Sequence, residues 1–97
     1  MQSIRIFGKP YRVERVEKYD DPKQEGSIDT FTGLITVLDR LGDHAAREII
    51  LHETIHAIDE ELALGFSEEQ VQRLSVALYS VYRENGMHLV ERPGGAE

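Results

Sequence analysis

Alternating apolar and polar residues dominate the first forty positions of the chain and predict β-strands there. Residues 4–6 and 11–16 alternate with a period of two and predict two extended segments, separated by the turn residues Gly8-Lys9-Pro10. Residues 27–31 predict a third strand, followed by a turn. The β-branched, apolar run 34–38 is the clearest strand of the chain. Together these segments predict a small, mostly antiparallel sheet with hairpin connections.

The apolar spacing becomes helical after residue 42 and predicts a first helix up to about Leu64. Asp43 is its expected N-cap, and Gly65 is expected to end it in the manner of a C′ glycine. Its predicted buried stripe consists of apolar residues at helical spacing: Leu51, Ile55, Ile58 and Leu62. Ala46 and Ile49 fall on the neighbouring side.

A second helix is predicted to begin directly after Ser67, which with Gln70 has the form of a capping box, and to stop at Asn85-Gly86. Its predicted apolar stripe is Val71, Leu74, Leu78 and Val81. We therefore expect an α+β fold in which a small sheet packs on the first helix and the second helix follows. Residues 1–90 form one domain in this interpretation, with 87–90 as a last short strand or packed tail and 91–97 as a flexible tail.

Composition narrows the classes of function. The 97 residues include no cysteine, so disulfides and cysteine-bound zinc are excluded, and any zinc must be bound by histidine and carboxylate. The formal net charge of −7 and the scattered basic residues argue against nucleic-acid or anionic-membrane partners. No signal peptide and no stretch long enough to span a membrane is recognisable. These features predict a cytoplasmic protein.

The first predicted helix carries an H-E-x-x-H motif, His52-Glu53-Thr54-Ile55-His56. Its two histidines lie one turn apart on one face and can bind one metal ion from the same side. Glu53 flanks that face, where its carboxylate can take a proton from a metal-bound water. The alternative is a surface helix that carries two histidines by chance. The other histidines, His44 and His88, are expected to be solvated rather than ligands.

A catalytic zinc site usually needs a third protein ligand. Glu60 continues the face of the motif, but it lies about 12 Å along the axis from His52, too far to share an ion. The third ligand is therefore expected from the first turn of the second helix, which contains Glu68 and Glu69. Glu68 shares a helix face with the small Ser75, so we prefer Glu68 and keep Glu69 as the alternative. Both glutamates also suit a helix N-terminus without any metal.

Residues 34–85 resemble the small zinc-dependent peptidases of the zincin class, gluzincin branch. They are most similar to the short phage- and prophage-associated relatives of the ImmA/IrrE-type metallopeptidases and to the minigluzincins. The likeness rests on residues 34–37, 48–58 and 67–71, with Leu74 and Leu78. The resemblance implies a bound zinc ion, the two motif histidines and a downstream glutamate as its ligands, and the motif glutamate as general base. It also implies a compact core of one small sheet and two helices.

One departure from that family's pattern concerns the third ligand. In the ImmA/IrrE pattern the ligand glutamate stands four residues before a large apolar residue that a small residue follows. Leu74-Ser75 matches this pair, which puts Gln70 in the ligand position, and glutamine is a poor zinc ligand. Either the register shifts to Glu68 or Glu69, or the site is altered.

The leading hypothesis is a zinc-dependent metallopeptidase, an endopeptidase rather than an exopeptidase. It would hydrolyse peptide bonds of a peptide or protein substrate through a zinc-bound water, with Glu53 as general base. Tyr82, or Tyr79, is a candidate donor to the developing oxyanion, with plain helix packing as the alternative for both. The strand 34–38 would hold an extended substrate if it is an exposed sheet edge beside the cleft.

Two functions of other classes stay open. The chain can be a zinc-binding interaction module of phage or prophage origin with weak or no catalysis, in which the metal mainly stabilises a small core. It can also lack a metal and use its acidic helices to bind a partner protein. An open coordination position that holds water would favour the peptidase over the interaction module.

Overall fold

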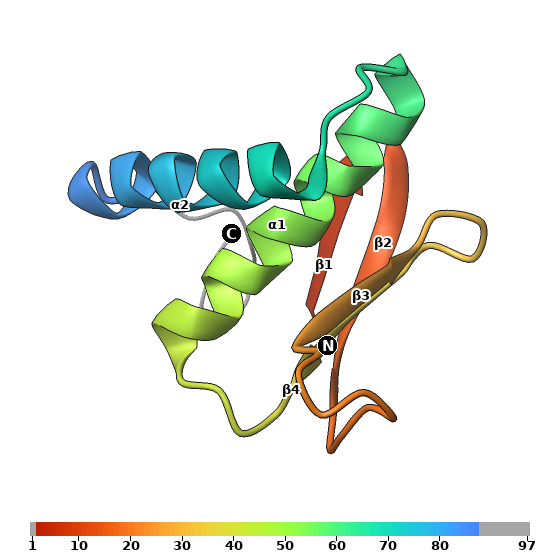
Figure 1. Ribbon diagram of the computed structural model, residues 1–97, viewed down its shortest axis with the longest axis vertical. Helices are drawn as coiled ribbons and strands as arrows, with labels where there is room; N and C mark the ends of the chain where they lie inside the picture. The colour runs from red at the N-terminus through yellow and green to blue at the C-terminus, as the bar shows by residue number, and fades with distance from the viewer. Residues whose placement is uncertain (1, 88–97) are drawn as a thin grey trace.

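The chain folds into three layers: a four-stranded sheet, helix α1 across one face of it, and helix α2 on the outer side of α1 (Figure 1). The computed structural model describes residues 2–87. The elements in chain order are β1 (Gln2–Ile6), β2 (Lys9–Val16), β3 (Gly26–Asp29), β4 (Leu34–Leu38), α1 (Asp43–Leu62) and α2 (Glu68–Glu84). The predicted α+β class is confirmed. Neither helix is long and apolar enough to pass through a membrane.

The strand order in the sheet is β1-β2-β4-β3. The β1–β2 and β3–β4 pairs are antiparallel, whereas β2 and β4 run parallel, so the sheet is mixed and mostly antiparallel, as predicted. Because β4 lies between β2 and β3, residues 34–38 do not meet the condition that substrate binding along this strand required, an exposed sheet edge. Next to β4, the strand at the edge of the sheet is β3. The loop between β2 and β3 leaves room for β4 to pair with both of them.

The strands bury one face against α1, as their alternating sequences require. Ile35 and Val37 lie at the centre of the core and are 0% and 1% exposed to solvent. The other strand residues in this cluster are Ile4, Ile6, Tyr11 and Val13, and α1 contributes Ala46, Ile50 and Ala57. Between Ile35 and Val37, Thr36 points to the opposite face, where its hydroxyl lies 2.5 Å from the hydroxyl of Tyr19. The core thus anchors α1 firmly to the sheet.

The two ends of α1 differ from the sequence expectation. The N-cap is Gly42 and not Asp43, which is the first helical residue and makes no side-chain cap. The helix ends at Leu62 because Ala63 adopts the left-handed conformation (φ 53°), two residues before Gly65. Leu62 is 52% exposed, so it does not belong to the buried stripe as predicted.

Helix α2 begins with the predicted capping box. The Gln70 amide N–H donates to the Ser67 hydroxyl at 3.1 Å, and the Ser67 N–H donates to the Gln70 side-chain oxygen at 2.8 Å. Val71 and Ser75 are fully buried against α1, but the predicted stripe residues Leu74 and Val81 are exposed. Within residues 2–87, α2 contacts α1 and none of the strands. The described residues stop at Met87. The rest of the short strand or tail expected at 87–90, including His88, and the tail 91–97 lie outside them.

Candidate metal centre

Three potential metal ligands converge where the first turn of α2 meets the middle of α1. His52 Nε2 lies 2.9 Å from Glu68 Oε2, and His56 Nε2 lies 3.0 Å from Glu68 Oε1. The two Nε2 atoms are 3.2 Å apart. Among the residues described, this is the group of histidine and carboxylate side chains that is close enough to hold one metal ion.

These separations fit a metal ion. Zinc with bonds of about 2.0 Å in tetrahedral geometry keeps neighbouring ligand atoms about 3.3 Å apart. The distances of 2.9 and 3.0 Å from the Nε2 atoms to the carboxylate oxygens, and of 3.2 Å between the two Nε2 atoms, are close to this value. Two nitrogens and one carboxylate are also the donors that zinc takes in catalytic sites. The Glu68 side chain is 71% exposed, so the group is open to solvent on that side.

The local structure explains why Glu68, rather than a neighbour, joins the histidines. The capping box fixes the first turn of α2 and engages Gln70, so the residue in the ligand position of the ImmA/IrrE pattern faces the helix start. Glu69 points elsewhere and pairs with Arg73 at 2.8 Å. Ser75 lies seven residues after Glu68 on the same face, and its complete burial lets α2 approach α1 closely. The structure thus places Glu68, and neither Glu69 nor Gln70, beside the histidines.

The histidine rings are held unequally. A metal-ligating histidine usually donates its second ring N–H to an acceptor that orients the ring. His52 Nδ1 is buried and has no hydrogen-bond partner in the described part of the chain. The His52 ring is therefore oriented by packing and by the contacts of its Nε2 atom, at a position that is 8% exposed, whereas His56 is half-buried.

Glu53 is buried beside the three candidate ligands and retains 9% of its exposure. Burial raises the pKa of its carboxyl group to about 7, with the charge of His56 lowering it and the charge of Glu68 raising it. A carboxyl group in this range can take up and release a proton near neutral pH. The position directly after the first histidine places this group at the site, as the sequence predicted.

A pocket of about 280 Å³ opens beside Glu53 and two of the three candidate ligands, His52 and Glu68. It is lined by residues of the β2–β3 loop, the start of β3, α1 and α2: Lys23, Gln24, Glu25, Gly26, Ile49, His52, Glu53, Glu68 and Gln72. The predicted ligands His52 and Glu68 and the predicted base Glu53 therefore share one solvent-accessible cavity. The loop residues and Gln72 were not foreseen from the sequence, because nothing in their local pattern links them to the motif.

Gly26 brings the sheet edge against the site. A Cβ atom at this position would lie 2.4 Å from Ile49 Cγ2 and 3.2 Å from Glu53 Oε2. Only glycine allows this approach of β3 to α1. In the sequence Gly26 is visible only as the end of a polar loop, so its role depends on a contact between segments that are far apart in the chain.

The two candidate tyrosines lie away from the metal centre, which corrects that part of the sequence interpretation. Tyr82 follows Glu68 by fourteen residues on one helix, about 21 Å along its axis. Its side chain packs against the apolar cluster of Leu51, Ile55 and Val71. The Tyr79 hydroxyl lies 2.7 Å from Nδ1 of His44, which is exposed as expected but has this partner. Helix packing, the stated alternative, describes both tyrosines.

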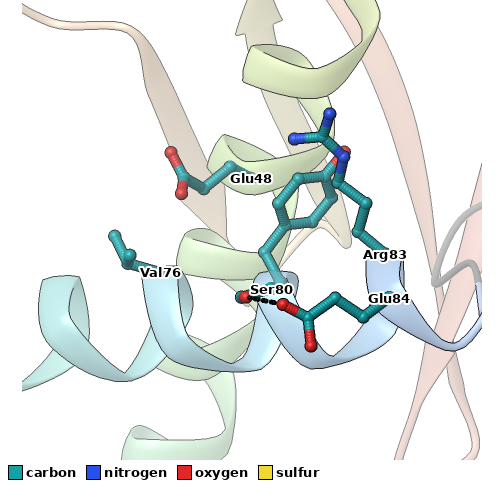
Figure 2. A pocket seen from close by; sticks show the side chains of 6 residues that line it. Glu48, Val76, Ser80, Arg83 and Glu84 are labelled. Atoms are coloured by element: carbon teal, nitrogen blue, oxygen red, sulfur yellow. Dashed lines mark hydrogen bonds between the residues drawn. The ribbon is translucent and has the colours of Figure 1, made fainter.

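Tyr79 belongs to a separate groove of about 450 Å³ between α1 and the second half of α2 (Figure 2). Its other lining residues are Glu48, Val76, Ser80, Arg83 and Glu84, and the Ser80 hydroxyl donates to Glu84 at 3.1 Å. None of the candidate metal ligands lines this groove. Its chemistry is therefore independent of the metal centre.

Comparisons of the chain with models of protein families, with curated proteins and with solved structures found no match. The function is therefore argued from the site itself.

Proposed function

We propose that this protein is a zinc-dependent metallopeptidase in which His52, His56 and Glu68 hold the metal and Glu53 is the general base. The observation that carries the proposal is the convergence of three zinc-type ligands, from two helices, next to a buried carboxylate in an open pocket. Zinc is the ion that suits this donor set of two imidazoles and one carboxylate. A bound zinc ion would acidify a water molecule and polarise a substrate carbonyl.

The protein's own groups would then move the protons and hold the substrate. Glu53 accepts the proton of the attacking water and passes it to the departing amine. The peptide adds in an extended conformation to the outer edge of β3, which pairs with no other strand within residues 2–87 and whose first residue lines the pocket. Backbone groups along that edge bind substrates of varied sequence, which suits an endopeptidase.

The test uses Glu53→Gln, which preserves the size of the side chain but cannot accept the proton. The variant should bind zinc as the wild type does and lose hydrolysis of an unstructured peptide mixture by about 100-fold or more. Glu61→Gln makes the same chemical change at an exposed position of α1 and should retain activity. Hydrolysis that survives Glu53→Gln at the wild-type rate would refute the assignment of the base.

An interaction module that binds zinc without catalysis is the second candidate. The observation that favours it is an open, mainly apolar groove on the outer side of α2, lined by Phe66, Gln70, Arg73, Leu74 and Ala77. A wild-type protein that binds one zinc ion per chain, unfolds when the zinc is chelated and hydrolyses no peptide would support this function in place of the peptidase.

A further inference from the structure

Lys23 is the cationic residue that lines the pocket of the metal centre. The other ionisable residues of this pocket are His52 and the glutamates Glu25, Glu53 and Glu68. Lys23 stands in the β2–β3 loop, and its side chain is exposed. Its backbone N–H is tied to the Asp21 carboxylate at 2.9 Å, which holds the loop in shape beneath the side chain.

The ammonium group of Lys23 forms no ion pair with any acidic group within residues 2–87. Other cations of the described residues, Lys18 among them, also lack a carboxylate partner, so Lys23 is distinguished by its place in the pocket. An unpaired cation that lines a pocket attracts an anionic group of a ligand and adds little to the fold itself. Lys23 lies three residues before Gly26, the first residue of β3. The anionic group would therefore belong to a peptide that lies along the sheet edge.

We infer that Lys23 binds a carboxylate of the peptide next to the bond that is cleaved, and so selects substrates that carry one there. This inference rests on the proposed function and names the substrate class of the same site. The carboxylate can come from an acidic side chain or from the free C-terminus of the peptide. The Gln24 side chain, which lines the same pocket, donates to the Gly26 carbonyl at 3.0 Å. Gln72 supplies a neutral hydrogen-bonding group and leaves the charge selection to Lys23.

The experiment measures how fast the zinc-loaded protein cleaves matched pairs of peptides. One pair differs by Glu against Gln beside the cleaved bond, and a second pair differs by a free carboxylate against an amide at the C-terminus. We expect kcat/KM to favour the carboxylate in one of the pairs by about three- to tenfold at low ionic strength, and the preference to fall as salt is added. The pair that shows the preference identifies the source of the carboxylate.

Two variants test the residue. Lys23→Gln should abolish the preference and Lys23→Glu should reverse it, through KM rather than kcat. Lys18→Gln removes the same charge at an exposed position that lines a different pocket and should leave the preference intact. Peptides that are cleaved with no preference, or a preference unchanged in Lys23→Gln, would overturn the inference while the proposed function stands.

A binding measurement separates failure of the inference from failure of the proposed function. The same peptides are titrated calorimetrically into zinc-loaded Glu53→Gln, with and without Lys23→Gln. If the wild type cleaves no peptide, the proposed function fails, and tighter binding of the carboxylate peptides that depends on Lys23 still supports the contact between Lys23 and a carboxylate. Equal binding of both members of each pair contradicts it.

Discussion

Replacing Glu53 by Gln should stabilise the metal-free protein, and by an amount that depends on pH. Burial raises the pKa of Glu53 in the folded protein to about 7, from an ordinary value of 4.5. The folded state therefore favours the protonated carboxyl group, and ionising it inside the protein costs free energy. The amide of glutamine never ionises, so Glu53→Gln removes this cost.

The sign follows from the direction of the shift. A group whose pKa is raised by folding stabilises the protein fully only below its unfolded pKa, and this contribution is lost as the pH rises through about 7. A shift from 4.5 to about 7 corresponds to roughly 3 kcal/mol as an upper limit, at 1.36 kcal/mol per pH unit. Water reaching the pocket reduces this to about 2 kcal/mol. Relative to wild type, the variant should therefore gain about 2 kcal/mol between pH 4.5 and 8.

Urea unfolding followed by circular dichroism measures this gain, because the chain has no tryptophan and its helices give a strong signal. Both proteins are treated with a chelator and unfolded at several pH values from 4.5 to 8.5. Glu61→Gln, at an exposed position of α1, is the control and should show a difference that changes little with pH. A flat difference for Glu53→Gln, or a variant less stable than wild type at pH 8, would refute the reasoning.

Three further substitutions test other parts of the site. Glu68→Gln should weaken zinc binding by more than about 100-fold, which exceeds the effect of losing a residue that only hydrogen-bonds to a ligand. Glu69→Gln should change zinc affinity little, and calorimetric titration with zinc compares the two variants. Gly26→Ala should destabilise the fold by about 1–3 kcal/mol because the added Cβ would meet Ile49 Cγ2 at 2.4 Å. In urea unfolding, Gly26→Ala should cost less stability in an Ile49→Ala background. If the stability losses of the two substitutions simply add, the clash is contradicted. Ser67→Ala should cost about 1 kcal/mol through loss of the cap and also weaken zinc binding, because the cap holds the first turn that carries Glu68; an unchanged zinc affinity would speak against that link.

The secondary structure could be predicted because each element repeats a local pattern of polar and apolar residues. The order of the strands could not, since pairing between β2 and β4 joins segments that are more than twenty residues apart. One signal of this order was nevertheless present in the sequence. Residues 34–38 are almost continuously apolar, as in a strand covered on both faces, and all of them from Ile35 to Leu38 are buried. An edge strand would be expected to alternate more strongly.

The candidate site divides in the same way. His52, Glu53 and His56 follow from spacing on one helix, and Glu68 was preferred because a small residue one heptad later allows close helix packing. The structure brings these four together. The oxyanion donor was predicted on the same face of α2 as Glu68. A helix face extends along the helix axis, however, and Tyr82 lies about 21 Å from Glu68 along that axis. Gly26 and Lys23 enter the site through the β2–β3 loop, whose path depends on the strand order.

The candidate metal centre also depends on the contact between α1 and α2. Helix α1 is anchored in the main core. Among the described elements, α2 touches α1 alone, through the small cluster of Leu51, Ile55 and Val71 with the buried Ser75. Since Glu68 is on α2 and both histidines are on α1, a bound ion would connect the two helices. Zinc binding and the docking of α2 must then stabilise each other. In hydrogen exchange, zinc should therefore protect α2 more than the strands, and equal protection of both would contradict this coupling.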